Sequence, residues 1–371
     1  MSCTRGGTFA IIAGGGTGGH VYPAIALADA LAARGHDRTT LRFMGAQRGL
    51  EARAVPAAGY GIDLLGTRGL QRSMTLKNLV RNATLPFVLA RAVRRAIGIL
   101  RRLRPKVLVS VGGYASVPGV LAAKACRVPM VVHEQNAIPG LANRAAVALG
   151  ARAAVSLPGT ALRGAVITGN PVRAAVAQVR HEPDEGHAEI AIFGGSLGSA
   201  VLNDAALDLY DRWRARDDVS IHHIAGPRNF AATRSRLAAL RKPDDALRYE
   251  LVEYEQEMER LYARSTLAVC RAGAVTVAEL AAAGVPSVLV PWPGAAEDHQ
   301  TGNAQAMAGA GAAVVIRDDE CSGARLAGVA GDLLADPGRL ARMSAAAQSV
   351  GRPDAADRLA DLVEEVAGAT A

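Results

Sequence analysis

The sequence predicts an α/β protein made of two doubly wound, parallel-sheet domains separated by a cleft. Two glycine-rich turns, Gly14–Gly19 and Gly194–Gly198, each follow a short apolar run and precede a segment with helical spacing. They lie about 180 residues apart, which fits the start of a second domain better than a short-period repeat. At 371 residues the chain is also too long for one ordinary core. We expect domains at residues 1–173 and 174–371, with a site in the cleft between them.

In the first half, apolar runs typical of strands alternate with helical segments. The first strand is expected at 8–13, and the helix after the glycine turn has its apolar face at residues 24–31 and is closed by Gly35. Further strands are expected at 40–44, 61–65, 107–111, 129–132, 153–156 and 165–167, and helices at 75–102 (interrupted near Pro86), 117–125 and 138–149. Ligands of parallel sheets bind at the carboxyl ends of the strands. The first glycine turn, Gly112–Tyr114 and His133–Asn136 should therefore converge.

The second half repeats this pattern after a polar surface link at 180–187. A strand at 188–193 leads through the second glycine turn into a helix at 201–213. Later strands are expected at 221–224, 266–270, 287–290 and 313–316, and the last two helices at 338–349 and 354–367. The last helix is a candidate to pack back on the N-terminal domain.

Composition excludes several classes of function. Aromatic residues are only 4% of the chain and are not interleaved with the basic ones, which argues against a nucleic-acid partner. The four cysteines are scattered, as in reduced cytosolic proteins. No apolar run has the length of a signal peptide or a transmembrane helix. We expect a protein that stays on the cytosolic side.

The net charge of +8 is unevenly distributed. Residues 64–133 contain many Lys and Arg but no Asp or Glu, which indicates an anionic partner or surface. Apolar positions flanked by basic ones favour a helix lying on an anionic membrane. The alternative is a solvated basic face over an internal apolar stripe. The predicted membrane or acceptor residues are Arg72, Leu76, Lys77, Leu79, Arg81, Phe87 and Tyr114.

The first glycine turn permits three interpretations. A strand-to-helix turn points backbone N–H groups and the positive end of a helix dipole at one spot, where a polar or anionic ligand can bind. The spacing Gly14-x-Gly16-x-x-Gly19 also matches the dinucleotide fingerprint, but no carboxylate follows the second strand before Glu51. An NAD site is therefore the weaker hypothesis, and an ordinary tight turn is the third.

Further candidate groups lie at the starts of expected helices. Glu279, near the start of the segment after the 266–270 strand, can accept two ribose hydroxyls, or it can be a helix-dipole residue without a ligand. Ser196 and Arg173 can bind phosphate or be ordinary turn residues. Gln300 follows a loop suited to sugar hydroxyls. His20 lies where a helix dipole favours the neutral ring, so it is a candidate base, although a structural role is the alternative.

No metal or other cofactor is expected. The sequence contains no Asp-x-Asp pair and no metal-ligand spacing. The charge of a diphosphate leaving group would therefore be stabilised by helix N-termini and arginine.

Six motifs in register resemble those of the lipid-linked N-acetylglucosaminyltransferases of bacterial peptidoglycan synthesis, in glycosyltransferase family 28. These motifs are Gly14–His20 with Tyr22-Pro23, His133–Asn136, Thr168–Arg173, Gly194–Ser196, Arg271–Glu279, and Asp298–Gln300 with Asn303. The resemblance covers about residues 8–310. Leu197 and Ala272 depart from the family's usual Gln and Ser, which affects only fine donor contacts.

The resemblance implies a GT-B architecture of two Rossmann-like domains, the first for the acceptor and membrane and the second for the donor. It implies inverting transfer of N-acetylglucosamine from UDP-N-acetylglucosamine to the 4-hydroxyl of undecaprenyl-diphospho-N-acetylmuramoyl-pentapeptide (lipid I), giving lipid II, at the cytoplasmic face of the inner membrane. His20 would be the base, and partners could include the cell-wall and division machinery. The implied donor-binding residues are Thr17, Gly18, Gly19, Asn136, Arg173, Ser196, Glu255 (through a nearby backbone group facing uracil), Ala274, Val275, Thr276, Val277, Ala278, Glu279 and Gln300.

Two other hypotheses stay open at this point. One is another UDP-sugar enzyme of the same architecture, such as an epimerase or a glycolipid synthase. The other is a non-catalytic nucleotide-sugar sensor or tethering module, in which His20 would not be needed beyond binding.

Overall fold

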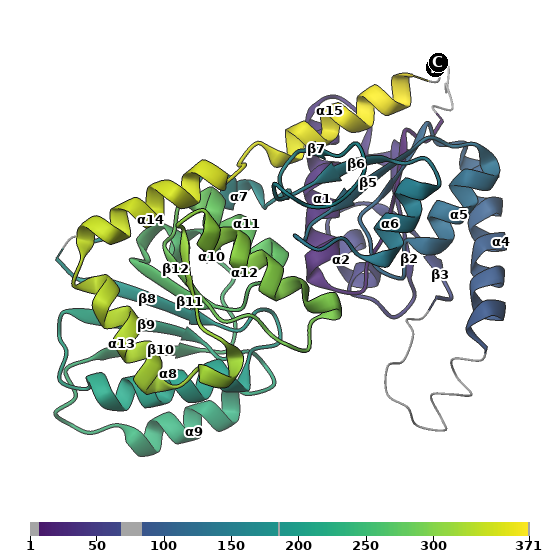
Figure 1. The fold of residues 1–371 in the computed structure, drawn as a ribbon. Coiled ribbons are helices and arrows are strands. Elements are labelled where there is room, and N and C mark those ends of the chain that lie inside the picture. The colour runs from purple at the N-terminus through teal and green to yellow at the C-terminus, as the bar shows by residue number, and fades with distance from the viewer. Residues whose placement is uncertain (1–6, 68–83, 185, 370–371) are drawn as a thin grey trace, which may run out of the picture. The chain divides into compact units, whose positions relative to one another are not determined.

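The computed structural model describes residues 7–67, 84–184 and 186–369. Its chain divides into two compact units, coloured along the sequence in Figure 1. Unit 1 comprises Met1–Arg173 and Asp354–Ala371, and unit 2 comprises Ala174–Pro353. The last helix, near the C-terminus, therefore belongs to unit 1, together with the N-terminal part of the chain.

Unit 1 contains a seven-stranded sheet with the order β3-β2-β1-β4-β5-β6-β7, and every pairing is parallel. The strands are β1 (Ala10–Ala13), β2 (Leu41–Ala46), β3 (Gly61–Leu65), β4 (Val107–Ser110), β5 (Met130–Glu134), β6 (Arg152–Val155) and β7 (Val166–Ile167). Its helices are α1 (Gly18–Ala33), α2 (Glu51–Ala57), α4 (Leu85–Leu103), α5 (Val117–Cys126), α6 (Leu141–Ala148) and α15 (Ala355–Gly368), with a 3-10 turn η1 (Arg38–Thr40).

Helices cover both faces of this sheet, so its central strands are apolar throughout. Strand β1 is completely buried, and its side chains alternate between two cores. Ala10 and Ile12 join the core that includes α1 and α15, whereas Ile11 and Ala13 join the core that includes α4 and α5. The period of two in a strand produces this division.

Unit 2 contains a six-stranded parallel sheet with the order β10-β9-β8-β11-β12-β13. The strands are β8 (Ala188–Phe193), β9 (Val219–Ile224), β10 (Arg248–Val252), β11 (Leu267–Cys270), β12 (Ser287–Leu289) and β13 (Ala313–Val315). Its helices are α7 (Ala174–Ala177), α8 (Ala200–Trp213), α9 (Phe230–Leu240), α10 (Met258–Arg264), α11 (Ala274–Ala283), α12 (His299–Gly309), α13 (Gly323–Leu334) and α14 (Pro337–Val350), with 3-10 turns η2 (Ala296–Asp298) and η3 (Asp318–Glu320).

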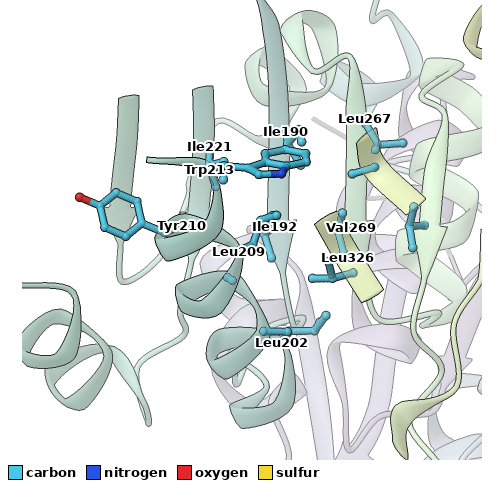
Figure 2. Close-up of a cluster of buried hydrophobic side chains, with 14 of the residues drawn as sticks. Ile190, Ile192, Leu202, Leu209, Tyr210, Trp213, Ile221, Leu267, Val269 and Leu326 are labelled. Atoms are coloured by element: carbon cyan, nitrogen blue, oxygen red, sulfur yellow. The ribbon is translucent and has the colours of Figure 1, made fainter. Parts of the chain in front are cut away.

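One core of unit 2 lies between this sheet and helices α8 and α13. Figure 2 shows Ile190 and Ile192 of β8 together with Leu202 and Leu209 of α8 and Leu326 of α13. The two parallel sheets confirm the predicted α/β class.

Several boundaries differ from those predicted. Helix α1 begins at Gly18, within the stretch predicted as the glycine turn, and it includes Pro23 in its first two turns. Pro86 lies in the first turn of α4, where its missing N–H costs nothing, and the expected helical residues 75–83 lie outside the described residues. Strand β10 and helices α2, α7, α9, α10 and α13 were not predicted. In β10, Arg248 and Glu250 are exposed, so this edge strand lacks a continuous apolar run.

Helix α15 packs on α1 within unit 1. Leu359 and Val363 are completely buried in the shared core. At the end of α1, the guanidinium of Arg34 donates to Asp361 at 2.6 Å and to Glu364 at 3.0 Å. Exposed ion pairs of this kind contribute little to the free energy of unfolding, so the apolar contact between α15 and α1 is the main interaction that holds α15 in place.

We expect Leu359→Ala to destabilise unit 1 by about 3 kcal/mol, because it leaves a cavity between α15 and α1. The measurement is urea unfolding followed by circular dichroism, since both tryptophans, Trp213 and Trp292, lie in unit 2. The control is Glu365→Ala on the exposed side of α15, with an expected change within about 0.5 kcal/mol. Equal free energies of unfolding for Leu359→Ala and Glu365→Ala would contradict the packing of α15 on α1.

Candidate functional site

A buried carboxylate holds the first glycine turn. Glu51 is 2% exposed, and its two oxygens accept the N–H groups of Gly16 and Ala46, each at 2.8 Å. A Cβ on Gly15 would lie 2.2 Å from the Glu51 carboxyl carbon, so only glycine fits there. The N–H of Gly16 is thus used within the protein and is not among those that the turn can offer to an anion. Because both oxygens of Glu51 already accept these backbone N–H groups, Glu51 is not placed to bind the ribose of a dinucleotide, which weakens the NAD hypothesis further.

His20 lies in the first turn of α1 and is half-buried. Its Nδ1 is 3.2 Å from Oε1 of Gln135. The amide nitrogen of Gln135 donates to the carbonyl oxygen of Val111 at 2.9 Å and lies 3.2 Å from Nδ1 of His133. Nε2 of His133 is 2.9 Å from the carbonyl oxygen of Gly169. Side chains and carbonyls from the ends of β4, β5 and β7 therefore form one chain of hydrogen bonds that ends at His20.

A second buried carboxylate orients Asn136. One oxygen of Glu134 accepts the backbone and side-chain N–H groups of Asn136, at 3.0 and 3.1 Å. The other accepts from the backbone of Gly140 at 3.0 Å and from the amide of Asn143 at 2.7 Å. With four donors, this carboxylate is well satisfied although it is buried.

Tyr114 lies beside the first glycine turn, as predicted for the ends of adjacent strands. A Cβ on Gly16, whose φ is +98°, would lie 3.4 Å from the Tyr114 ring. Burial, with a smaller contribution from the charge of Glu51, raises the pKa of Tyr114, so its hydroxyl is protonated at neutral pH.

In unit 2, Glu279 is buried in α11 and is held by a residue that the sequence analysis missed. Its Oε2 accepts the hydroxyl of Tyr262 at 3.0 Å. The Ala274–Ala278 segment forms the first turns of the same helix, after the N-cap residue Gly273. The structure therefore places a carboxylate and a helix N-terminus on one element, as the sequence predicted.

The other predicted donor residues of unit 2 follow three strands of the same sheet, β8, β10 and β12. Ser196 is exposed in the second glycine turn, after β8. Gln300 lies in the first turn of α12, and its Oε1 accepts the N–H of Trp292 at 2.9 Å. Glu255 follows β10, and its carboxylate accepts the N–H of Glu257 at 2.9 Å. All of them lie after the carboxyl ends of parallel strands.

Unit 1 holds the remaining predicted residues. Thr17 is the N-cap of α1, and Gly18 and Gly19 begin that helix. Arg173 ends the first segment of unit 1. Phe87 of α4 is 80% exposed. The predicted membrane residues Arg72, Leu76, Lys77, Leu79 and Arg81 lie outside the described residues.

Five residues that hold predicted site residues in place were not themselves predicted as site residues: Glu51, His133, Glu134, Gln135 and Tyr262. His133, Glu134 and Gln135 lie inside one of the six motifs, and Glu51 is the first carboxylate after β2, so these four carried a local signal. Tyr262 is on α10 and reaches Glu279 only through the tertiary fold.

Within residues 7–67, 84–184 and 186–369, no three His, Cys, Asp or Glu side chains gather so that they could hold a metal ion. In the same ranges, no helix has the length and apolarity needed to cross a membrane.

Comparison with known proteins identifies the family. The family model "Glycosyltransferase family 28 N-terminal domain" matches residues 10–155, and "Glycosyltransferase family 28 C-terminal domain" matches residues 189–359. Relatives from Alkalilimnicola ehrlichii and Methylococcus capsulatus are each 41% identical, over 96% and 97% of this chain and 98% and 99% of their own. Both are named UDP-N-acetylglucosamine--N-acetylmuramyl-(pentapeptide) pyrophosphoryl-undecaprenol N-acetylglucosamine transferase.

Solved structures agree with this assignment. The crystal structure of Acinetobacter baumannii MurG is 27% identical, with a TM-score of 0.78, and the match covers 96% of this chain and 99% of that one. The glycosyltransferase of kitacinnamycin, 17% identical with a TM-score of 0.70 over 98% of this chain and 99% of its own, shows the shared fold alone. The expected GT-B type of fold is confirmed by these neighbours, and the chain belongs to glycosyltransferase family 28.

Proposed function

We propose that the protein transfers N-acetylglucosamine from UDP-N-acetylglucosamine to the 4-hydroxyl of undecaprenyl-diphospho-N-acetylmuramoyl-pentapeptide, which converts lipid I to lipid II. The observation that carries the proposal is the near-complete match to relatives of that name, at 41% identity. The same match favours this reaction over that of an epimerase or a glycolipid synthase, and over a non-catalytic sensor.

In the proposed reaction, His20 removes the proton of the 4-hydroxyl as its oxygen attacks the anomeric carbon of the donor. The bond from that carbon to the diphosphate breaks, UDP leaves, and the anomeric configuration is inverted. The position of His20 in the first turn of α1 supports this role, since the helix dipole favours a neutral ring that can accept a proton.

Unit 2 would bind most of the donor. Glu279 accepts the ribose hydroxyls, the N–H groups at the start of α11 face the diphosphate with Ser196, Gln300 contacts the sugar, and a backbone group near Glu255 faces uracil. Thr17, Gly18, Gly19, Asn136 and Arg173 of unit 1 complete the proposed donor set. The diphosphate charge is balanced by helix N-termini and arginine, and the proposal includes no metal ion.

The acceptor carries a polyprenyl chain, so we place the reaction at the anionic cytoplasmic face of the inner membrane. Helix α4 supports this location. Phe87 and Leu89 near its start are 80% and 37% exposed, and Arg91, Arg94 and Arg95 on the same helix are exposed. Tyr114 is proposed to contact the acceptor. Partners among the cell-wall and division machinery rest on the resemblance alone.

We expect His20→Ala to lower kcat by roughly 10²- to 10⁴-fold, because general-base catalysis contributes about that much. The assay is transfer of radiolabel from UDP-N-acetylglucosamine to a lipid I analogue. The control is His36→Ala, which removes another histidine of unit 1, paired with Glu364 at 2.8 Å, and should leave kcat unchanged. Failure of the wild-type protein to form a labelled disaccharide lipid would end the proposal.

We expect Glu279→Gln to raise the KM for UDP-N-acetylglucosamine by about tenfold or more, since a charge-assisted hydrogen bond contributes about 1.5–3 kcal/mol. Tyr262→Phe should raise the same KM by less, because it removes the hydrogen bond from the Tyr262 hydroxyl to Glu279 but keeps the carboxylate itself. A matched control is Tyr249→Phe, a buried tyrosine of unit 2 that bonds His223. If the control changed KM as much as Glu279→Gln did, the ribose assignment would be wrong.

We expect charge reversal of Arg72, Lys77 and Arg81 to weaken co-sedimentation with anionic vesicles at low salt, and less so at high salt. The control reverses Arg234, Arg325 and Arg339, exposed residues of unit 2, with the same change in net charge. Equal loss of binding in both triple variants would point to net charge rather than to a membrane surface in the basic region.

A further inference from the structure

We propose that Gln135 and His133 are positioning residues that fix the tautomer of His20, so that Nδ1 carries the proton and Nε2 is the basic nitrogen. This inference deepens the proposed transfer and rests on it for the role of His20 as base. It depends only on hydrogen bonds within unit 1.

The direction of the hydrogen-bond chain is set at its far end. The carbonyl oxygen of Gly169 can only accept, so Nε2 of His133, at 2.9 Å, must carry a proton. His133 is completely buried, and this burial lowers its pKa to about 4. The ring is therefore neutral at pH 7, and its Nδ1 holds a lone pair that can only accept.

The amide of Gln135 transmits this direction. Its NH2 group has two hydrogens, and two acceptors face it: Nδ1 of His133 at 3.2 Å and the carbonyl oxygen of Val111 at 2.9 Å. The reversed amide would place its oxygen against both acceptors, so it is excluded. Gln135 is only 1% exposed, and thus water cannot compensate for a reversed amide.

The oxygen of Gln135 must then face His20. An amide oxygen only accepts, so Nδ1 of His20, at 3.2 Å, carries the proton. A neutral imidazole has one N–H, which leaves the lone pair on Nε2. After Nε2 takes a proton from the acceptor hydroxyl, the same amide oxygen stabilises the imidazolium through Nδ1–H, as the carboxylate does in hydrolase triads.

A glycine lies beside the basic edge of the ring. A Cβ on Gly113, whose φ is +75°, would approach Cδ2 of His20 to 3.1 Å and Nε2 to 3.4 Å. The backbone after β4 thus passes close to the nitrogen that we assign as the base, and glycine at position 113 permits this close approach.

The first test is direct. The full chain labelled with ¹⁵N-histidine is studied at pH 7 by long-range ¹H–¹⁵N correlation, which distinguishes the two tautomers of each ring. His20 is assigned with the His20→Gln variant. We expect the Nδ1–H form for His20 and the Nε2–H form for His133. An Nε2–H form of His20 in the wild-type protein would overturn the proposal.

An internal reference is present in unit 2. Nε2 of His223 faces Oδ1 of Asn203 at 3.0 Å, and Nδ1 faces the hydroxyl of Tyr249 at 2.7 Å. Because the amide nitrogen of Asn203 donates to Ala225, His223 should be in the Nε2–H form in every variant. Its signals therefore report whether a change at Gln135 has disturbed the protein as a whole.

The second test uses two substitutions at one position. Gln135→Met removes the acceptor, and we expect a mixture of His20 tautomers and a fall in kcat of about tenfold or more, with KM for UDP-N-acetylglucosamine within about twofold of the wild-type value. Gln135→Glu keeps an acceptor for Nδ1–H if its carboxyl is protonated, because its one O–H can then be donated to the carbonyl oxygen of Val111 while the other oxygen faces His20. This neutral side chain should keep the tautomer and recover part of kcat. The control is Gln348→Met, exposed on α14, which should change neither quantity.

Each outcome bears on one proposal only. An unchanged tautomer in Gln135→Met, or no recovery in Gln135→Glu, would refute the positioning role. The tautomer is measured without substrate, so it can be confirmed even if the lipid acceptor proves wrong. Conversely, absence of transfer by the wild-type protein would refute the proposed function and leave the tautomer result intact.

Discussion

The parallel pairing at the centre of each sheet is the constraint on which both sets of site residues depend. The first strand of each unit lies inside its sheet: β1 pairs with β2 and β4, and β8 pairs with β9 and β11. The other strands of the sheet are therefore added on both sides of that first strand. The connecting helices on one side of it cover one face of the sheet, and those on the other side cover the opposite face. A topological switch point of this kind opens a crevice at the carboxyl ends. Both glycine turns begin there, and so do the segments that carry His20, Gln135, Ser196 and Glu279.

The two glycine turns are held by opposite charges. In unit 1 the carboxylate of Glu51 lies beneath the turn and binds the N–H of Gly16. In unit 2 the buried guanidinium of Arg271 donates to the hydroxyl of Ser199, which caps α8 after the second turn, and to the carbonyl oxygen of Val290. It also pairs with Asp318. A buried charge is stable only when donors or acceptors surround it, and both are surrounded. The charge of Glu51 is met by backbone N–H groups, whereas that of Arg271 is balanced by Asp318.

The sequence predicted those features that depend on local pattern. Apolar runs that end in glycine located β1, β4 and β8, and a similar run before Arg271 located β11, because strands buried on both faces are continuously apolar. It did not predict β10, an edge strand with alternating exposure. The sequence analysis placed Gly18 and Gly19 in the turn before α1, although these two glycines begin the helix. The sequence identified His20 and Glu279 as candidates, but not the groups that hold them, since Gln135 and Tyr262 come from elements 115 and 17 residues away.

The hydrogen-bond chain behind His20 is neutral throughout, and its surroundings explain why. Unit 1 already buries two carboxylates, Glu51 and Glu134, each satisfied by N–H donors of the loops that it fixes. A third carboxylate at position 135 would be 1% exposed and would face the carbonyl oxygen of Val111, so its charge would have no compensating donor there. An amide supplies the acceptor that His20 needs and the two donors that Val111 and His133 need. The geometry of four neutral groups thus determines which nitrogen of one histidine is basic, while the charged groups of the same unit determine the shape of the loops around it.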